Sequence, residues 1–180
     1  MRRAFPVICT AVLLTGCGAA NQPRSTEVRQ SQVVISATAS GSARVIPAQL
    51  AFTGKTVDGQ DFAGADLAGT PAVLWFWAPW CPKCQGEAED IAKVAKENEG
   101  SVKFVGVAAQ DEVPAMRAFI EEYGLGSFPH IADTEARVWQ RFGVYAQPAY
   151  AFISADGTID LQTRQLQTDD LNRRVRALAG

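Results

Sequence analysis

The sequence lacks any basic run, any internal repeat and any apolar stretch long enough to cross a membrane. Its 180 residues carry 17 basic and 19 acidic side chains, for a formal net charge of -2. A weakly acidic surface is repelled by phosphate, so nothing favours nucleic acid as a partner. The composition, 47% hydrophobic and 20% charged, supplies a full core for one domain of ordinary size.

Residues 1–16 have the layout of a secretory signal. Arg2 and Arg3 precede an apolar stretch over residues 5–14, which small residues follow. The stretch is too short for a membrane-spanning helix. We therefore expect residues 1–16 to be removed as a signal peptide during export.

The run LTGC at residues 14–17 resembles a bacterial lipobox, in which the cysteine becomes linked to lipid. We expect a lipidated Cys17, because several acyl chains on one cysteine anchor a protein stably. The protein would then sit on the extracytoplasmic face of the cell membrane, with partial secretion. The alternative is ordinary cleavage near Ala19 or Ala20, which leaves a soluble secreted protein.

Residues 17–44 are expected to be the lipidated N-terminus and a flexible tether. From Gly18 to about Arg44 the chain is rich in Ser, Ala, Gln and Thr and has no aromatic residue. The apolar run Val33-Val34-Ile35 leaves a short strand open as an alternative. The tether would hold the domain, residues 45–180, away from the membrane.

Cysteine is scarce, and only two thiols remain after processing. Of the 4 cysteines, Cys9 leaves with the signal and Cys17 would carry lipid. A structural disulfide between Cys81 and Cys84 would close a very small loop and constrain the unfolded chain little. A redox role explains the pair better.

Metal ligands are equally scarce in the mature chain. A zinc site needs more ligands than the two cysteines, and only His130 and carboxylates are available. Copper is disfavoured because Met116, the one methionine left, has the helical spacing of a core residue. We therefore expect no metal and no cofactor, and we assign His130 no role beyond that of a loop histidine.

Strand and helix signals alternate from Val45 onward, which predicts an α/β domain. We expect a parallel unit followed by an antiparallel pair, giving a central mixed sheet flanked by helices. Asp58-Gly59 predicts the turn of an N-terminal hairpin extension, and Thr168 is the expected N-cap of the last helix. The expected strands cover residues 50–56, 60–62, 72–77, 102–108, 149–153 and 158–161, and the expected helices cover residues 82–98, 116–123, 134–142 and 168–178.

Cys81 and Cys84 stand where a buried strand ends and a helix begins. Residues three apart in a helical turn can bridge, and the first lies at the helix N-terminus. Its thiol should ionise more readily than a free one, because the free N–H groups and the helix dipole favour an anion. Pro82 suits the first helical position, and Lys83 adds a nearby positive charge. We expect Cys81 to attack and Cys84 to resolve the mixed disulfide.

The segment VLWFWAPWCPKC at residues 73–84 resembles the active-site strand and loop of the thioredoxin superfamily. Gln147-Pro148-Ala149 resembles its cis-proline loop. With FVGVAAQDEVPAM and QPAYAFI, residues 45–180 closely resemble the exported disulfide-bond-forming proteins of mycobacteria, the DsbE and DsbF type near the TlpA-like branch. The resemblance implies a thioredoxin-like fold and a protein thiol–disulfide oxidoreductase.

The resemblance also implies a substrate-binding surface around the cysteines. Pro148 would be cis and lie against the disulfide, leaving the Gln147 backbone free to pair with a substrate strand. The alternative is an ordinary trans proline at a strand start. Trp80, Pro82 and Lys83 would complete the surface, with Trp80 offering an apolar contact.

Glu87 is the third catalytic candidate, because the TlpA-like branch carries a glutamate near the buried thiol. Thioredoxin has an aspartate six residues before the first active-site cysteine, and that position is Trp75 here. Proton transfer to or from Cys84 would therefore use Glu87 or water. The alternative is that Glu87 is a solvated carboxylate early in a helix. Relatives commonly have proline two residues after this glutamate, where this chain has Glu89. The kink that such a proline would cause in the helix is therefore in question here, although the chemistry is not.

The expected function is oxidation of dithiols in newly exported, partly unfolded proteins, with a membrane redox partner that resets the disulfide and with the protein as a monomer. A reductant serving cytochrome c maturation would use the same residues with the opposite electron flow. A third alternative is a non-catalytic surface lipoprotein that uses the fold to bind a partner.

Overall fold

The computed structural model describes residues 46–180. The expectations for the signal peptide, the Cys17 anchor, and the tether lie outside the described residues. Within residues 46–180, no helix combines the length and the apolar character needed to span a membrane.

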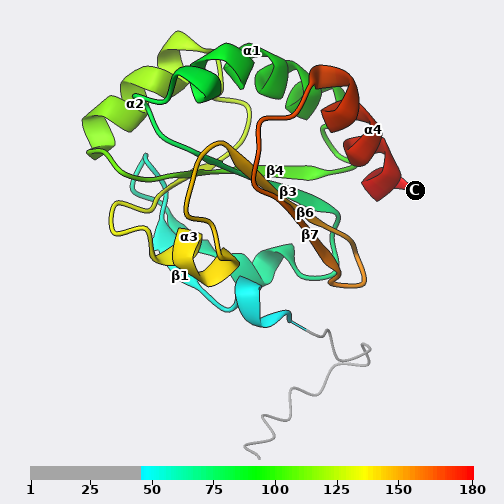
Figure 1. Cartoon of the computed structure of the whole chain (residues 1–180). Coiled ribbons are helices and arrows are strands. Elements are labelled where there is room, and N and C mark those ends of the chain that lie inside the picture. The colour runs from blue at the N-terminus through cyan, green and yellow to red at the C-terminus, as the bar shows by residue number, and fades with distance from the viewer. Residues whose placement is uncertain (1–45) are drawn as a thin grey trace, which may run out of the picture. The chain divides into compact units, whose positions relative to one another are not determined.

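A five-stranded mixed sheet forms the centre of the domain, with strand order β5-β4-β3-β6-β7 (Figure 1). β3 pairs in parallel with β4 and antiparallel with β6, while β4–β5 is parallel and β6–β7 antiparallel. The parallel unit followed by an antiparallel pair is therefore confirmed. The strands are β3 (Ala72–Trp77), β4 (Lys103–Ala108), β5 (His130–Ala132), β6 (Ala149–Ile153) and β7 (Ile159–Gln162).

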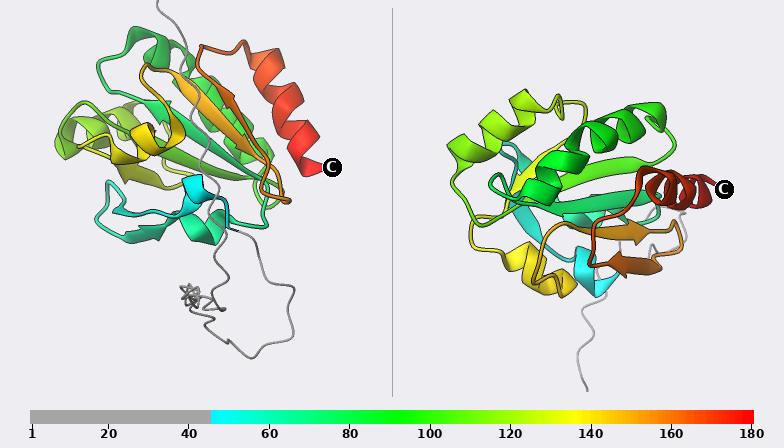
Figure 2. Two further views of the ribbon diagram at one scale, coloured as in Figure 1. Left: turned by 60° about the horizontal axis from the view of Figure 1, so that its bottom comes forward. Right: turned by 45° about the horizontal axis from the view of Figure 1, so that its top comes forward.

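Helices cover both faces of this sheet, as Figures 1 and 2 show. The long helices α1 (Pro82–Glu97), α2 (Val113–Glu122) and α4 (Thr168–Ala179) pack on one face. The short helix α3 (Arg137–Phe142) and the 3-10 turns η1 (Ala48–Leu50) and η2 (Gly64–Leu67) pack on the other. The expectation of a central sheet between helices is confirmed.

The central strand β3 is buried along its whole length. Val73, Trp75 and Trp77 contribute to the core beneath α1, α2 and α4, while Leu74 and Phe76 contribute to the core on the opposite face. A strand covered on both faces needs apolar residues at every position, which explains why its sequence does not alternate.

The N-terminal hairpin is present as a separate two-stranded sheet of β1 (Thr53–Lys55) and β2 (Asp61–Ala63). Its turn contains Gly59, whose φ of 82 is readily available only to glycine. The amide of Val57 donates a hydrogen bond of 2.7 Å to the carbonyl of His130. This bond attaches the hairpin to β5.

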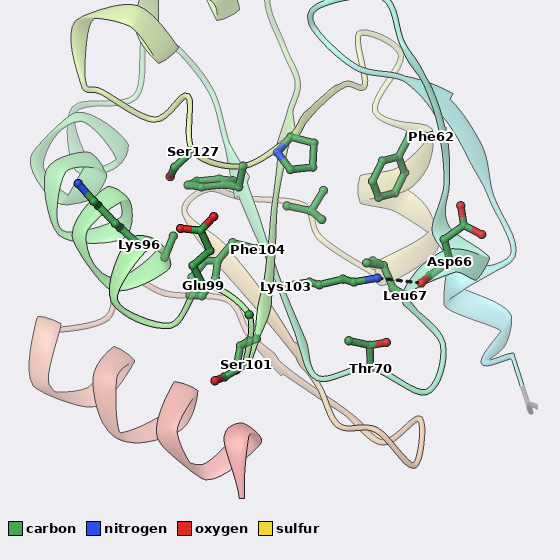
Figure 3. Close-up of a pocket in the computed structure, with 16 residues that line it drawn as sticks. Phe62, Asp66, Leu67, Thr70, Lys96, Glu99, Ser101, Lys103, Phe104 and Ser127 are labelled. Carbon is green, nitrogen blue, oxygen red and sulfur yellow. Dashed lines mark hydrogen bonds between the residues drawn. The ribbon is translucent and has the colours of Figure 1, made fainter.

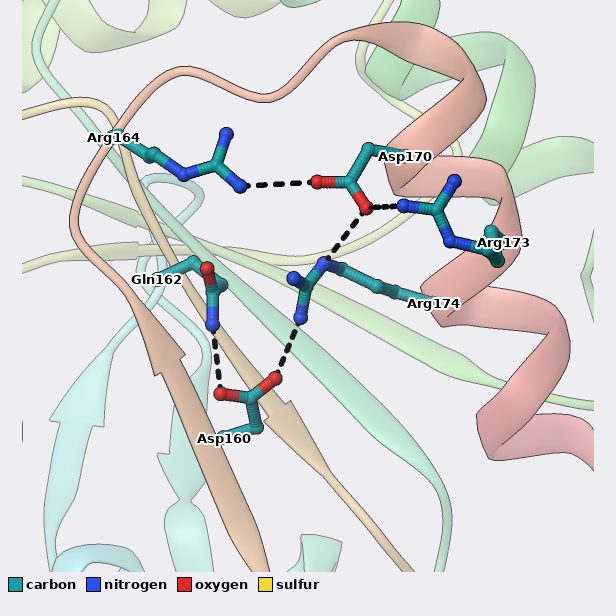
Figure 4. A network of polar contacts seen from close by, with 6 residues as sticks. All are labelled: Asp160, Gln162, Arg164, Asp170, Arg173 and Arg174. Carbon is teal, nitrogen blue, oxygen red and sulfur yellow. Dashed lines mark hydrogen bonds and ion pairs between the residues drawn. The ribbon is translucent and has the colours of Figure 1, made fainter.

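Acidic and basic side chains attach α4 to β7 (Figure 4). Asp170, in the first turn of α4, pairs with Arg164, Arg173 and Arg174. Arg174 also pairs with Asp160 of β7 at 2.7 Å. Most of these side chains are exposed, so each ion pair contributes at most about 1 kcal/mol to stability. The network that they form together holds α4 against β7 better than any single pair.

Three local expectations are wrong. His130 begins β5 and is buried, so it is not a loop histidine. Gln167 occupies the N-cap of α4, and the Thr168 hydroxyl instead donates to Asp90 of α1 at 2.5 Å. α3 begins at Arg137 rather than Thr134, because the Asp133 carboxylate accepts from the amides of Arg137 and Trp139.

An apolar groove of about 500 Å³ opens at the N-terminal end of β4 (Figure 3). Its lining includes Phe62, Leu67, Phe104 and Phe128. Because Ala72 pairs with Lys103 at this end of β3, the groove lies at the opposite end of the sheet from the cysteines. It therefore takes no part in the redox site.

Candidate active site

The two cysteines lie at the start of α1, immediately beyond the C-terminal end of β3. Cys81 is the N-cap residue, Pro82 is the first helical residue, and the amide of Cys84 donates to the Sγ of Cys81 at 3.2 Å. The amide of Cys81 bonds to the carbonyl of Ala78 at 3.1 Å and closes the turn between strand and helix. The first sulfur therefore occupies the position where a helix stabilises an anion.

The two thiols have different environments. Cys81 is 4% exposed and Cys84 is 0% exposed, so Cys81 is the more accessible of the two thiols. It is nevertheless less exposed than we expected for the sulfur that exchanges with a client. Burial, followed by the hydrogen bond from Cys81, raises the pKa of the Cys84 thiol well above its usual range. Cys84 consequently needs a proton acceptor before it can attack as a thiolate.

Glu87 lies one helical turn after Cys84 and is only 5% exposed. The alternative of a solvated carboxylate is therefore wrong. Burial raises the pKa of Glu87 to about 7, although the neighbouring side chains of Tyr150, Trp75 and Gln165 act to lower it. Its Oε1 accepts a hydrogen bond of 2.7 Å from the indole N–H of Trp75, whereas its Oε2 has no hydrogen-bond partner among the described residues.

Tyr150 of β6 belongs to the same buried cluster. Burial raises its pKa far above the usual range, and the negative charge of Glu87 raises it further. The phenol therefore stays protonated. Sequence reasoning missed this residue, because a tyrosine in an apolar strand has the pattern of ordinary core.

The loop before β6 lies at the same end of the sheet as the cysteines, because Phe76 pairs with Ala149. The Gln147–Pro148 peptide bond is cis, as expected. Pro148 is buried and Gln147 is half-buried. The active-site turn and the cis-proline loop therefore lie at the same end of the sheet.

Two aromatic side chains are exposed at this end. Trp80 is 50% exposed, with its indole N–H donating to the carbonyl of Gln110 at 3.0 Å, and Tyr145 is 83% exposed. Tyr145 was missed by sequence reasoning, since one tyrosine in a loop carries no periodic signal. Pro82 and Lys83 are also exposed, and the Lys83 carbonyl accepts from Gln165 at 3.2 Å.

Trp77 is fully buried behind the turn and packs edge-on against His130 with ring centroids 5.6 Å apart. Burial lowers the pKa of His130 to about 4, so the ring is neutral near pH 7. Within residues 46–180, no group of three or more His, Cys, Asp or Glu side chains is placed to hold a metal ion. His130 is a structural residue here.

Two thiols three residues apart at a helix N-terminus can pass between dithiol and disulfide with little movement of the backbone. A mixed sheet that presents such a pair beside a cis-proline loop is the architecture of the thioredoxin-like thiol–disulfide oxidoreductases. The family model described as AhpC/TSA matches residues 46–162. The chain belongs to this family and is a thiol–disulfide oxidoreductase of the DsbE/DsbF type.

Similar proteins support the assignment. The soluble secreted antigen MPT53 of Mycobacterium tuberculosis is 44% identical over 133 residues, which cover 72% of this chain and 76% of that protein. The structure of MTB dsbF in its mixed oxidized and reduced forms has 52% identity and a TM-score of 0.73, covering 74% of this chain and 99% of that one. A secreted M. tuberculosis disulfide oxidoreductase homologous to E. coli DsbE has 43% identity and a TM-score of 0.69, covering 72% and 98%.

Proposed function

We propose that the protein oxidises dithiols of exported, unfolded proteins through a disulfide between Cys81 and Cys84. The carrying observation is that the Cys81 sulfur caps α1 and receives the amide hydrogen bond of Cys84. The free N–H groups and the dipole of a helix N-terminus favour an anion, and a cysteine pair with a stabilised thiolate favours the dithiol form. A pair whose dithiol is favoured gives up its disulfide readily, which is the property of an oxidant.

The reaction has two exchange steps. A client thiolate attacks the Cys81 sulfur, the Cys81–Cys84 bond breaks, and Cys84 leaves with the electron pair. A second client thiolate then attacks the client sulfur of the mixed disulfide and releases Cys81 as a thiolate. The client loses two electrons and gains a disulfide, while the protein becomes a dithiol. A membrane redox partner then takes the two electrons and restores the disulfide.

Glu87 supplies the proton that Cys84 needs. In the oxidising direction its carboxyl group protonates the departing Cys84 thiolate, and in the reverse direction the carboxylate removes that proton. Support comes from its burial beside Cys84 and from its pKa of about 7, which lets the group act in both directions near neutral pH.

The client surface combines a backbone edge with exposed aromatic rings. The Gln147 backbone pairs with an extended client segment next to Pro148, and Pro82 and Lys83 border the sulfurs. Trp80 and Tyr145 give apolar side chains of an unfolded client a place to pack. Support comes from their 50% and 83% exposure at the cysteine end of the sheet.

The protein acts outside the cytoplasm, as the relative described as a soluble secreted antigen indicates. We further propose that Cys17 is lipidated and tethers a monomer to the outer face of the cell membrane. Globomycin, which inhibits lipoprotein signal peptidase, should cause the uncleaved precursor to accumulate. Unchanged processing under the drug would mean ordinary secretion without a lipid anchor.

The test of the sulfur roles is replacement of each cysteine by serine. Cys81→Ser should abolish exchange with a client disulfide, because no sulfur is left in the accessible position. Cys84→Ser should react with the same client disulfide and accumulate a mixed disulfide on Cys81, because no thiol resolves it. Non-reducing electrophoresis and mass spectrometry measure both results, and equal, mild effects of the two changes would contradict the assignment.

The direction of electron flow is tested by the reduction potential against glutathione. About 30 mV corresponds to roughly 1.4 kcal/mol for this two-electron couple. We expect a value much less negative than the roughly -270 mV of thioredoxin. A value near that of thioredoxin would support the reductant alternative instead.

A further inference from the structure

Among residues 46–180, the indole N–H of Trp75 donates a well-formed hydrogen bond to the Glu87 carboxyl group, while the side chains of Tyr150 and Gln165 lie close to it. Trp75 lies on β3, is 0% exposed, and donates its indole N–H to Oε1 at 2.7 Å. The opposite oxygen, Oε2, has no hydrogen-bond partner among residues 46–180. One oxygen is therefore held by the strand and the other is left available.

We infer that Trp75 is a positioning residue for proton exchange at Cys84, holding Glu87 by one oxygen so that the other serves the buried thiol. The inference rests on the proposed role of Glu87. Cys84 and Glu87 are three residues apart on α1 and share a face of the helix. A carboxyl group with free rotation would spend less time facing the sulfur, so a fixed donor increases the useful population.

An indole suits this task because it donates one hydrogen bond and accepts none. It does not titrate in the working pH range, so it cannot compete with Cys84 for the proton. A donor to the carboxylate also stabilises its charged form, which partly offsets the effect of burial on the pKa of Glu87. Trp75 thus orients the carboxyl group and, together with Tyr150 and Gln165, lowers the pKa that burial raises.

The remaining polar and charged groups around Glu87 are few. Cys84 and Asp90 come from α1, Tyr150 comes from β6, and Gln165 comes from the segment before α4. Tyr150 stays protonated because burial raises its pKa, and Gln165 does not titrate. The pH dependence of proton exchange near neutral pH is therefore assigned to Glu87.

The experiment follows the resolving step in the reduced protein. Cys81 attacks a small model disulfide, breaks its S–S bond with release of one model thiolate, and forms a mixed disulfide with the other half. The Cys84 thiol then passes its proton to the Glu87 carboxylate, its sulfur bonds to Cys81, and the model thiol leaves with the electron pair. Acid quenching and mass spectrometry measure the formation and the decay of the mixed disulfide separately, across pH.

Trp75→Phe keeps an aromatic ring but removes the N–H donor. We expect formation of the mixed disulfide to be unchanged. The inflection of the decay rate should move upward by about one pH unit, and decay at pH 6.5 should slow about tenfold. In a Glu87→Gln background the same change should have no further effect on decay, because the two residues act as one unit.

Trp77→Phe is the matched control. Trp77 lies two residues along the same strand, is equally buried, and its indole nitrogen has no hydrogen-bond partner among the described residues. It should lose packing without moving the decay profile. If Trp75→Phe unfolds the protein, β-(3-benzothienyl)alanine at position 75 keeps the bicyclic shape and removes only the N–H.

The outcomes separate the inference from the proposed function. A wild-type decay profile in Trp75→Phe, or equal shifts in the Trp75 and Trp77 variants, would overturn the role of Trp75 alone. A wild-type profile in Glu87→Gln would overturn the role of Glu87 as well. Failure of the unaltered protein to form any mixed disulfide would overturn the proposed function itself.

Discussion

Gly106 of β4 lies against two buried ring nitrogens, one from His130 and one from Trp77. A Cβ at this position would lie 2.0 Å from Nδ1 of His130 and 2.8 Å from the indole nitrogen of Trp77. Both nitrogens lack hydrogen-bond partners within the described part of the chain. The absence of a side chain at position 106 therefore allows the two rings to meet behind the active-site turn.

Gly106→Ala should lower the free energy of unfolding by about 1–3 kcal/mol, since neither ring can withdraw from a packed core. Gly126→Ala is the control, because a Cβ there meets nothing within 4 Å. It should change stability by no more than about 1 kcal/mol. Urea unfolding of both variants measures the difference, and equal effects would show that Gly106 is not a tight position.

The proposed function assigns Tyr145 to client binding rather than to sulfur chemistry. Tyr145→Ser should raise the KM for a reduced, unfolded client several-fold, because an exposed aromatic contact is lost. The rate of exchange with a small dithiol should stay the same. Steady-state kinetics with both substrates measure this contrast, and an equal loss with both substrates would refute a role limited to binding.

The sequence indicated Cys81 and Cys84 because two thiols three residues apart at a strand-to-helix junction have the placement that disulfide exchange requires. It left Glu87 ambiguous, since helical periodicity does not show whether a neighbouring tryptophan will bury a carboxylate. Only the structure shows Trp75 on β3 donating to Glu87 on α1, 12 positions apart in the chain. Tyr145 carried no signal, because exposure in a loop is decided by tertiary packing.

At the scale of elements, α3 depends on one carboxylate. Asp133 accepts from the amides of Arg137 and Trp139 at 2.9 and 3.0 Å, and it is 7% exposed. These bonds satisfy amides that the first turn of a helix leaves free. They also explain why the helix begins three residues later than its sequence pattern indicated.

Asp133→Ala should lower the free energy of unfolding by about 1–2 kcal/mol, through loss of the cap at the start of α3. Glu135→Ala is the comparison, because its ion pair with Arg137 is exposed and should contribute less than about 1 kcal/mol. Both changes are measured by urea unfolding. A smaller loss for Asp133→Ala than for Glu135→Ala would contradict the capping role.

The long elements β3 and α1 were predicted, as were the shorter strands β6 and β7, whereas the three-residue strand β5 was not. The apolar run of β3 and the apolar stripe of α1 each specify a buried element directly. β5 has only three residues, His130–Ala132, and its strand character comes from pairing with β4 and from the hairpin bond to Val57. No local pattern of three residues carries that information.

At the scale of the whole molecule, two buried groups make stability depend on pH in opposite senses. Glu87 has its pKa raised from 4.5 to about 7, so the folded protein keeps a proton that the unfolded chain loses. Stability from this group is present below pH 4.5 and is lost as the pH rises to about 7. His130 has its pKa lowered from 6.5 to about 4, so its contribution is lost as the pH falls through that range.

The contribution of Glu87 to the pH dependence is isolated by comparing the unfolding free energy of Glu87→Gln with that of the unaltered protein. The difference should shift in favour of the variant by about 3 kcal/mol between pH 4.5 and pH 7, since one pKa unit corresponds to about 1.4 kcal/mol. The contribution of His130 is common to both proteins and cancels. Urea unfolding of the reduced proteins across pH measures the shift, and a difference that is constant with pH would contradict the buried, raised carboxyl group.

The central claim is that the two sulfurs are chemically unequal and that Cys81 is the one that reacts. Competitive alkylation of the reduced protein with iodoacetamide, followed by peptide mass spectrometry, tests this directly near neutral pH. The account predicts that Cys81 is modified at least tenfold faster than Cys84, which is fully buried and holds its proton. Equal rates, or faster modification of Cys84, would contradict it.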